Sequence, residues 1–352
     1  MGEERITIRA GGRTYSSFLR VEVTAAFNEA ARTFQIECAH EGGPGVTQWT
    51  FAAGAPVSIA FNGQTVLTGY VDRYQPRISA RECTAIVSGR SKAADMVDSA
   101  AEHPKGEWRD KTVGDLAKDL DKFGVGVKVE GALRKIKVMR ITPGETAFRA
   151  IERYCRSQGL TIAGQPGGEI LITKAGTRRH AGGLIEGDNL LEAEADHNWS
   201  GRHSEYRVRG QRPDGHGPSN LEIERLARDA AVRRYRPAIV VVEEDTDDER
   251  AGERAKNRRD RAAGAALRAT VTVQGFRDKA GTIWEPGRLI YVESPRLAIH
   301  QDMLVERAEW RQSEGGSLCT LGLVDPRAYG GKAGKGNKSG VAWAPGRDKD
   351  ER

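Results

Sequence analysis

The chain has 352 residues, with 55 Lys and Arg against 49 Asp and Glu, so its formal net charge is +6. No apolar run approaches the ~20 residues that a membrane-spanning helix needs, and the acidic first residues lack an apolar signal segment, so we expect neither membrane insertion nor export. Seven basic and three acidic residues fall within 327–352, which we expect to be a flexible basic tail. The rest of the chain is nearly neutral, so its charge is a poor indication of nucleic-acid binding.

Short apolar or β-branched runs, separated by Gly, Pro and Asn, fill residues 6–90. Asn62-Gly63 lies between two of these runs and predicts a tight hairpin. Short strands at this spacing are typical of a sandwich or barrel. We therefore expect a first β-barrel domain over residues 1–92.

The pattern changes to a small α/β insert over residues 93–185. Thr112 and Asp115 predict a capped helix, and Thr142-Pro143-Gly144-Glu145 predicts a second one that begins with Thr142 as N-cap and Glu145 closing a capping box. The apolar runs 160–162 and 170–172, joined by a glycine-rich turn, predict a hairpin.

Strand-like runs return after residue 185, at 206–209 and 239–242. We expect residues 186–245 to be the first part of a second β-barrel domain and 270–326 to be its second part. A long polar helix over 246–269, opened by a Thr246–Glu249 capping box, is expected between them. Its narrow face of small residues permits close approach of another element but buries little area. The fold class is thus α+β and β-rich, with two similar barrels, an α/β insert between them and a polar helix inserted in the second.

The two β-rich regions share an order of landmarks. Trp49 and Trp284 each precede a glycine, a short strand, a long strand, a polar turn and a Cys-Thr pair, at Cys83-Thr84 and Cys319-Thr320. Both a true duplication and a chance likeness of two β-meanders are open on this pattern.

Motifs that carry chemistry are sparse. Cys38, Cys83, Cys155 and Cys319 form no C-x-x-C pair, which excludes the usual zinc and iron–sulfur spacings and indicates reduced thiols. The glycine-rich run 330–339 fails the phosphate-loop spacing, because Asn337 stands where the lysine belongs.

The segment from Asp196 to His216 is the most site-like part of the chain. It holds three of the seven histidines with two acids nearby, and it suits either a polar loop or a metal or acid–base site. The members of this group are Asp196, His197, His203, Asp214 and His216.

Arginines cluster at 225–236 and 254–261, but acidic residues are interspersed with them. This mixture favours a surface or subunit interface rich in ion pairs over a nucleic-acid face.

Several short segments follow one another along almost the whole chain, and none of them is a catalytic signature: 69–74 (GYVDRY), 85–91 (AIVSGRS), 95–98 (DMVD), 144–148 (GETAF), 155–160 (CRSQGL), 275–276 (GF), 281–287 (GTIWEPG), 304–306 (LVE) and 321–326 (LGLVDP). In the order and coverage of these segments, the chain resembles the Mu-like tail proteins that form the baseplate hub of contractile phage tails.

The resemblance implies a fold shared with the hub of T4-type tails and the base of type VI secretion spikes. It implies a homotrimer whose six barrels form a pseudo-sixfold ring, joining a sixfold tail tube to a threefold central spike beside other baseplate proteins. The ring would enclose a channel through which DNA passes without sequence-specific contacts. The location would be the virion, after assembly in the host cytoplasm.

We therefore expect a structural virion protein and no enzyme, without catalytic, cofactor-binding or metal-ligating residues and without a cofactor. Two alternatives stay open: a cell-wall polysaccharide hydrolase that uses residues 196–216, and a nucleic-acid-binding module that uses the arginine clusters.

Overall fold

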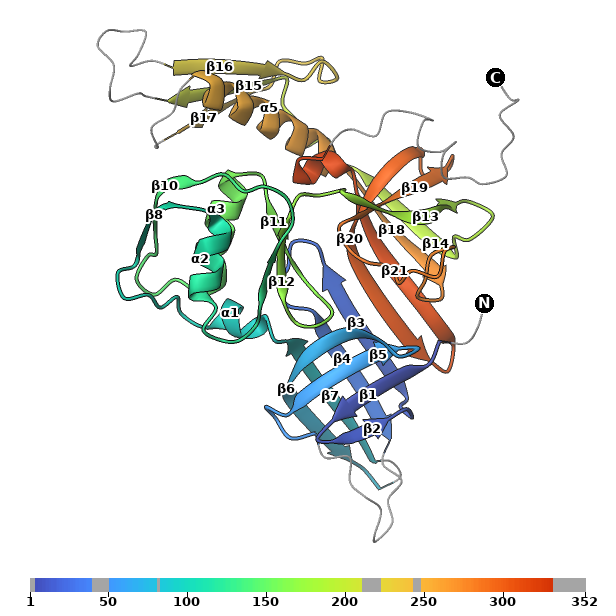
Figure 1. Cartoon of the computed structure of the whole chain (residues 1–352). Helices are drawn as coiled ribbons and strands as arrows, with labels where there is room; N and C mark the ends of the chain where they lie inside the picture. Colours follow the sequence, from blue (N-terminus) through green and yellow to red (C-terminus); the bar gives the residue numbers. More distant parts are fainter. Residues whose placement is uncertain (1–3, 40–50, 81–82, 211–222, 243–247, 332–352) are drawn as a thin grey trace.

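The computed structural model describes residues 4–39, 51–80, 83–210, 223–242 and 248–331. Figure 1 shows one β-rich part at the bottom and another at the right, an α/β part at the left and a small sheet with a helix at the top. Within the described residues, no helix is apolar and long enough to span a bilayer.

The first β-rich part, which we call the first half, is an antiparallel sheet with the strand order β2-β1-β5-β6-β7-β4-β3. Asn62 and Gly63 join β5 to β6 with φ angles of 48° and 81°, the left-handed pair that a two-residue hairpin requires, so the predicted turn is confirmed. The strands are β1 (Ile6–Ala10), β2 (Arg13–Tyr15), β3 (Arg20–Ala26), β4 (Thr33–Ala39), β5 (Pro56–Phe61), β6 (Gln64–Ile78) and β7 (Cys83–Ser91).

The second half is built from β13 (Arg178–Ile185), β14 (Glu192–His197), β18 (Leu267–Gln274), β19 (Arg288–Ser294), β20 (Ile299–Ser313) and β21 (Gly316–Val324). Its order, β13-β19-β20-β21-β18-β14, repeats the order β1-β5-β6-β7-β4-β3 of the first half. Strands β6 and β20 each have 15 residues, and β7 and β21 each have 9. The shared strand order supports duplication over chance; Trp49, one of its landmarks, lies outside the described residues.

A β-bulge marks the same position in both long hairpins. The β6–β7 register shifts between Val71 and Arg73, and the β20–β21 register shifts between Val305 and Arg307. Arg73 and Arg307 are thus equivalent residues of the two halves. Bulges are specific features that bend a strand at a defined point, so a shared bulge strengthens the case for duplication.

One antiparallel ladder joins the two halves. Strand β20 pairs with β3 from Arg307 opposite Ala26 to Gln312 opposite Val21, and we call this ladder the seam. The result is a continuous sheet of 13 strands over one apolar core that draws on both halves. The β-rich α+β class is confirmed. Within the described strands no barrel closes, and the two-barrel description stays a prediction.

The α/β insert has its own apolar core between its helices and two small sheets. Thr112 caps α2 in a capping box with Asp115, as predicted, and β11 pairs with β12 in the predicted hairpin. Its elements are α1 (Ala94–Asp98), β8 (Glu107–Lys111), α2 (Val113–Leu120), β9 (Val127–Val129), β10 (Ile136–Arg140), α3 (Ala147–Ser157), β11 (Thr161–Gly164) and β12 (Ile170–Thr173).

The predicted start of the next helix is wrong by one turn. Thr142 and Glu145 do bond to each other, with the Thr142 N–H donating to Glu145 Oε1 over 2.5 Å, but they close a turn in which Gly144 has a φ of 84°. That left-handed residue stops the backbone from continuing as a helix. Thr146 is the actual N-cap of α3, since its side chain accepts from the Arg149 N–H.

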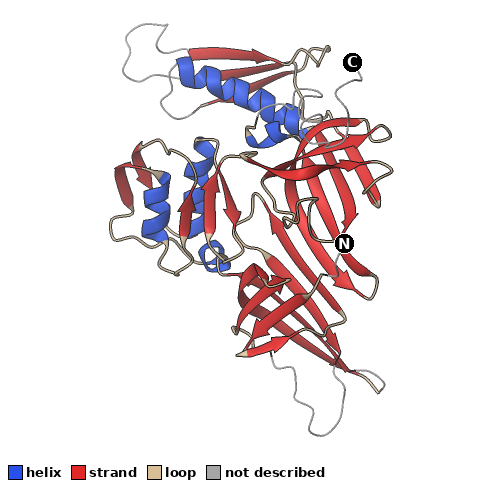
Figure 2. Ribbon diagram, turned by 45° about the vertical axis from the view of Figure 1, so that its right-hand side comes forward, coloured by secondary structure: helices blue, strands red, loops and turns tan. Residues whose placement is uncertain are grey.

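Strands β15 (Glu205–Gly210), β16 (Ile223–Arg228) and β17 (Pro237–Val241) form a separate sheet, which we call the small sheet. The helix α5 (Asp248–Ala265) covers one face of it, and its C-terminal part approaches the 3₁₀ helix η1 (Pro326–Tyr329), as Figure 2 shows. Residues 205–241 therefore do not belong to the second half, although the prediction assigned 186–245 to it. Ala251 and Ala255 of α5 pack against the apolar face of the small sheet, so that face is buried without contact with another sheet.

Candidate assembly site

Arg32 fastens three parts of the molecule. Its guanidinium is 2% exposed and bonds the Gly164 carbonyl oxygen of the insert at 3.0 Å and Glu285 of the second half at 2.7 Å. A third bond, also 3.0 Å, reaches the Val66 carbonyl oxygen of the first half. A buried charge is tolerated only when it is paired and hydrogen-bonded, so this contact fixes the parts relative to one another.

The side of the continuous sheet that faces away from the core is polar, and we call it the polar face. Along β3, β4 and β7, core side chains such as Val23 alternate with partly or fully exposed ones. A hollow on this face lies over the first half. It is lined mainly by polar groups, Glu22, Thr24, Thr33, Gln35, Asp72, Ser88 and Arg90.

Charges of both signs lie close together on and beside this face. Arg20 pairs with Glu22 at 2.8 Å, and Arg90 pairs with Asp72 at 2.6 Å. The second carboxylate on Arg90, that of Asp98, has a lowered pKa because it accepts from the guanidinium. The face is therefore a mosaic of ion pairs and carries no uniform positive field.

The structure disperses the residues of the predicted 196–216 group. Asp196 and His197 lie at the end of β14, where the His197 Nε2 is 2.8 Å from the Leu297 carbonyl oxygen. His203 lies in a loop, with its Nδ1 3.2 Å from the Gly201 carbonyl oxygen. Asp214 and His216 lie outside the described residues. Among the residues that are described, no three His, Cys, Asp or Glu side chains gather as a metal site would require.

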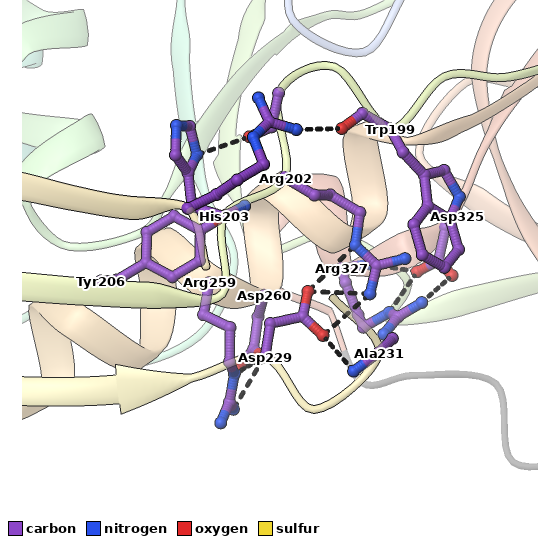
Figure 3. A network of polar contacts seen from close by, with 12 residues as sticks. Trp199, Arg202, His203, Tyr206, Asp229, Ala231, Arg259, Asp260, Asp325 and Arg327 are labelled. Atoms are coloured by element: carbon purple, nitrogen blue, oxygen red, sulfur yellow. Dashed lines mark hydrogen bonds and ion pairs between the residues drawn. The ribbon is translucent and has the colours of Figure 1, made fainter. Parts of the chain in front are cut away.

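The loop after β14 instead contributes residues to a network of polar contacts, drawn in Figure 3. Arg202 binds the carboxylate of Asp229 through two nitrogens, at 3.0 and 2.8 Å, and its guanidinium stacks 4.1 Å from the centre of the Trp199 ring. Nearby, Arg327 of η1 binds Asp325 at 2.8 Å. The first pair ties the loop before β15 to the turn after β16, and the second lies at the start of η1, so both arginines are engaged with acids.

Several members of the predicted arginine clusters are also paired. Arg225 pairs with Asp248, Arg228 with Glu205 at 3.3 Å, and Arg259 with Asp260 at 2.8 Å. These contacts agree with the surface rich in ion pairs that the charge mixture predicts.

Sequence patterns missed the pairing of Arg32 with Glu285 and that of Arg202 with Asp229, although Arg202 lies in the 196–216 segment and Asp229 lies among the clustered arginines. Each pair joins residues that are distant along the chain, and neither pair belongs to a periodic or spaced motif. No local signal marks either arginine, since Arg32 lies between Ala31 and Thr33 and Arg202 between Gly201 and His203.

Three family models match this chain in succession. Residues 5–91 match the N-terminal domain of "Mu phage baseplate assembly protein GpP-like", and residues 93–174 match the second domain of "Baseplate hub protein gp44-like". Residues 247–331 match the fourth domain of "Mu phage baseplate assembly protein GpP".

Similarity also extends over whole proteins. The baseplate hub protein gp44 of Escherichia phage Mu is 27% identical over 92% of this chain and 88% of its own length. The 43 kDa tail protein of prophage MuSo2 from Shewanella oneidensis is 27% identical, with a TM-score of 0.84 over 92% of this chain and 99% of that one.

A more distant likeness concerns the fold alone. An Escherichia coli component of the type VI secretion system, described as similar to T4 tail proteins, has a TM-score of 0.56. It is 8% identical and covers 90% of this chain and 76% of its own.

The resemblance stated from sequence is thereby confirmed in order, coverage and fold. The chain is a homologue of the Mu baseplate hub protein gp44, and three of its segments match domains of phage baseplate proteins, which supports a structural component of a phage tail baseplate.

Proposed function

We propose that three copies of this chain form the hub of a contractile tail baseplate, with six similar halves arranged in a ring. The observation that carries this proposal is the duplicated strand order, joined into one sheet at the seam. Two equivalent units in one chain turn a threefold assembly into one with six similar positions, which suits contact with a sixfold tube on one side and a threefold spike on the other. In this proposal the two halves are the two barrel-like domains.

The polar face is the surface proposed to line the channel of this ring. Its paired charges, such as Arg20 with Glu22, offer a hydrated wall without a strong net attraction for phosphates. DNA then passes without being held at a sequence-specific or tight site. The tube protein, the spike protein and other baseplate proteins are the proposed partners, and host cytoplasm is the proposed place of assembly.

The hub role is tested on the purified full-length chain. Light scattering coupled to gel filtration is expected to give three times the chain mass, and negative-stain images are expected to show a threefold ring with six lobes. A stable monomer at high protein concentration, with no binding to tube or spike proteins from the same particle, contradicts the proposal.

We also propose that the chain has no hydrolytic activity of its own. The support is that the homologues are structural proteins and that His197 and His203 each lie beside a backbone carbonyl. A peptidoglycan zymogram is expected to show no clearing. Clearing that the His197→Ala and His203→Ala variants abolish favours the hydrolase.

A further inference from the structure

Among the strand edges of the continuous sheet that have no strand partner within the described residues are those of β6 and β14. Strand β6 pairs with β5 over Gln64–Tyr70, but beyond Arg73 it pairs only with β7. Strand β14 pairs only with β18. Free edges of this kind expose backbone donors and acceptors that another strand can use.

The internal repeat says which strand belongs on each free edge. In the second half, the part of β20 beyond Arg307 is equivalent to the free part of β6, and it pairs with β3 of the first half. Strand β3 pairs with β4 as β14 pairs with β18, so β3 and β14 are also equivalent. The seam is therefore a contact between two equivalent halves, and the chain forms this contact once. The free part of β6 is equivalent to one side of the seam, and the free edge of β14 is equivalent to the other side.

The register of this missing contact follows residue by residue. Because Arg73 and Arg307 are equivalent, Arg77 is equivalent to Arg311. Following the paired residues from β7 through β4 to β3, and from β21 through β18 to β14, makes Glu194 equivalent to Glu22. Arg311 lies opposite Glu22 in the seam. The carried-over register sets the following residues opposite each other: Tyr74 and His197, Gln75 and Asp196, Pro76 and Ala195, Arg77 and Glu194, Ile78 and Ala193.

The side chains fit this register. Neither Arg77 nor Glu194 makes an ion pair with another described residue, and the carried-over register sets these opposite charges across from each other. Their counterparts Arg311 and Glu22 also lie opposite each other in the seam, where Glu22 pairs with Arg20 of its own strand. Ile78 is 81% exposed and would be covered beside Ala193. Both lie on the core side of their strands, since Ala193 packs against the large core.

Charge complementarity extends beyond one pair. The outward side chains of β14 are Glu192, Glu194 and Asp196, and those of the free part of β6 include Arg73 and Arg77. Pro76 has no N–H, so the ladder has one backbone bond fewer than the seam, a loss of about 1 kcal/mol. A proline on an edge strand also hinders pairing with unrelated strands.

We propose that residues 74–78 of β6 pair antiparallel with residues 193–197 of β14 of the partner subunit, in the register that the seam defines. Three such contacts alternate with three seams and close the ring in a head-to-tail manner, since the two edges differ. The proposal rests on the hub function above, and it identifies a second copy of this chain as the occupant of both edges.

Charge reversal provides the first test. Arg77→Glu sets two carboxylates opposite each other at all three contacts, so the protein concentration for half-assembly is expected to rise about tenfold. Glu194→Arg is expected to do the same, and combining the two substitutions is expected to restore assembly. The control is the same charge reversal on the insert, Arg109→Glu, at a side chain that is 71% exposed and whose ion-pair partner Glu107 is also on the insert; it is expected to leave assembly unchanged.

Cross-linking provides the second test. In a Cys83→Ser background, Pro76→Cys and Ala195→Cys in one chain are expected to form disulfides between copies and give a covalent trimer on a non-reducing gel. The pair Pro76→Cys and Ala193→Cys, displaced by one step along the same face, is expected to cross-link at least fivefold less.

The outcomes separate this proposal from the hub function. A wild-type trimer that ignores the charge reversals and does not cross-link overturns the β6–β14 contact and leaves the trimeric hub intact. A wild-type chain that stays monomeric under all conditions overturns both. Preferential cross-linking of the displaced pair overturns the register.

Discussion

Trp310 and Val23 lie directly opposite each other across the seam, and neither side chain is exposed to solvent. The Trp310 ring also meets Phe61 of the first half edge-on, with 5.9 Å between ring centres, and Phe61 packs against Phe276 of the second half at 4.6 Å. The seam is therefore closed by side chains as well as by backbone hydrogen bonds.

Trp310→Ala is expected to lower the free energy of unfolding by about 3–5 kcal/mol, because it leaves a cavity at this junction. Trp310→Phe is expected to cost less, since the buried indole Nε1 has no hydrogen-bond partner among the described residues that could be lost. Urea unfolding followed by far-UV circular dichroism measures both. The control Tyr235→Ala, at a residue that is 73% exposed, is expected to change stability by less than about 0.5 kcal/mol. Equal effects of Trp310→Ala and Tyr235→Ala contradict the assignment.

Arg32→Met is expected to destabilise the protein by about 3–5 kcal/mol, because it removes the cation that satisfies Glu285 and two carbonyl oxygens. Glu285→Gln is expected to cost less, since the guanidinium keeps the two carbonyls. Thermal unfolding at neutral pH checks the order of the two variants. A larger loss for Glu285→Gln shows that the carboxylate, not the arginine, is the central member.

Gly264→Ala and Gly252→Ala are expected to act in opposite directions, although both glycines lie within α5. A Cβ at Gly264 would lie 2.1 Å from the backbone N of Ala328, whereas one at Gly252 meets nothing within 4 Å. The first substitution is expected to cost about 1–3 kcal/mol by forcing η1 away, and the second to gain about 0.5–1 kcal/mol from the better helix former. Chemical unfolding measures the free energy of unfolding of both variants. A higher free energy of unfolding for both shows that η1 can move away from α5 at little cost.

Asp278 is expected to make stability depend on pH. Burial alone would raise its pKa, but hydrogen bonds from His180 and from the Ala181 and Thr282 N–H groups outweigh burial and hold the pKa below its ordinary value of 3.8. The stabilisation is therefore present above that value and is lost as the pH falls through the lower folded pKa. The stability gap between wild type and Asp278→Asn is expected to be about 1–3 kcal/mol at pH 7 and to shrink towards pH 3. A gap of constant size at both pH values shows that the carboxylate charge is unimportant.

Cysteine labelling is expected to separate Cys83 from the other three thiols. Burial, with a smaller contribution from a neighbouring glutamate, raises the pKa of Cys38 and Cys155 to about 12, and burial raises that of Cys319 as well. Cys83 is only partly buried. Iodoacetamide at pH 8 is expected to modify Cys83 first and the others only in denaturant, as read by mass spectrometry of peptides. Early labelling of Cys38 contradicts the burial described for β4.

The turns and helix caps of this fold were predictable when they depend only on residues close together in the sequence. Asn62-Gly63 accepts left-handed backbone angles in any context, and Thr112 finds its Asp115 partner three residues away. Thr142 misled for the same reason, since a Thr-to-Glu contact forms equally well in a turn, and the deciding fact was the left-handed Gly144.

Long-range features were not predictable from one sequence. The strands at 205–241 have the apolar alternation of any half-buried sheet, and nothing local says that α5 covers them instead of the second half. The pairing of Arg32 with Glu285 likewise depends on bringing β3–β4 and the segment before β19 together in space. The repeat was visible as an order of landmarks, but its bulges and its seam required the strand pairings.

The seam also has a consequence for synthesis on the ribosome. The strands of the first half are contiguous in the chain, so they can fold early, but the partner of the β3 edge is Ile299–Ser313 near the other end. At ordinary translation speeds that edge waits on the order of tens of seconds for its partner. A nascent chain with an unpaired β3 edge can pair with a neighbouring copy, so slow translation or a high concentration of nascent chains favours misassembled oligomers. A chaperone that covers β3 until β20 has been synthesised is expected to raise the yield of folded protein.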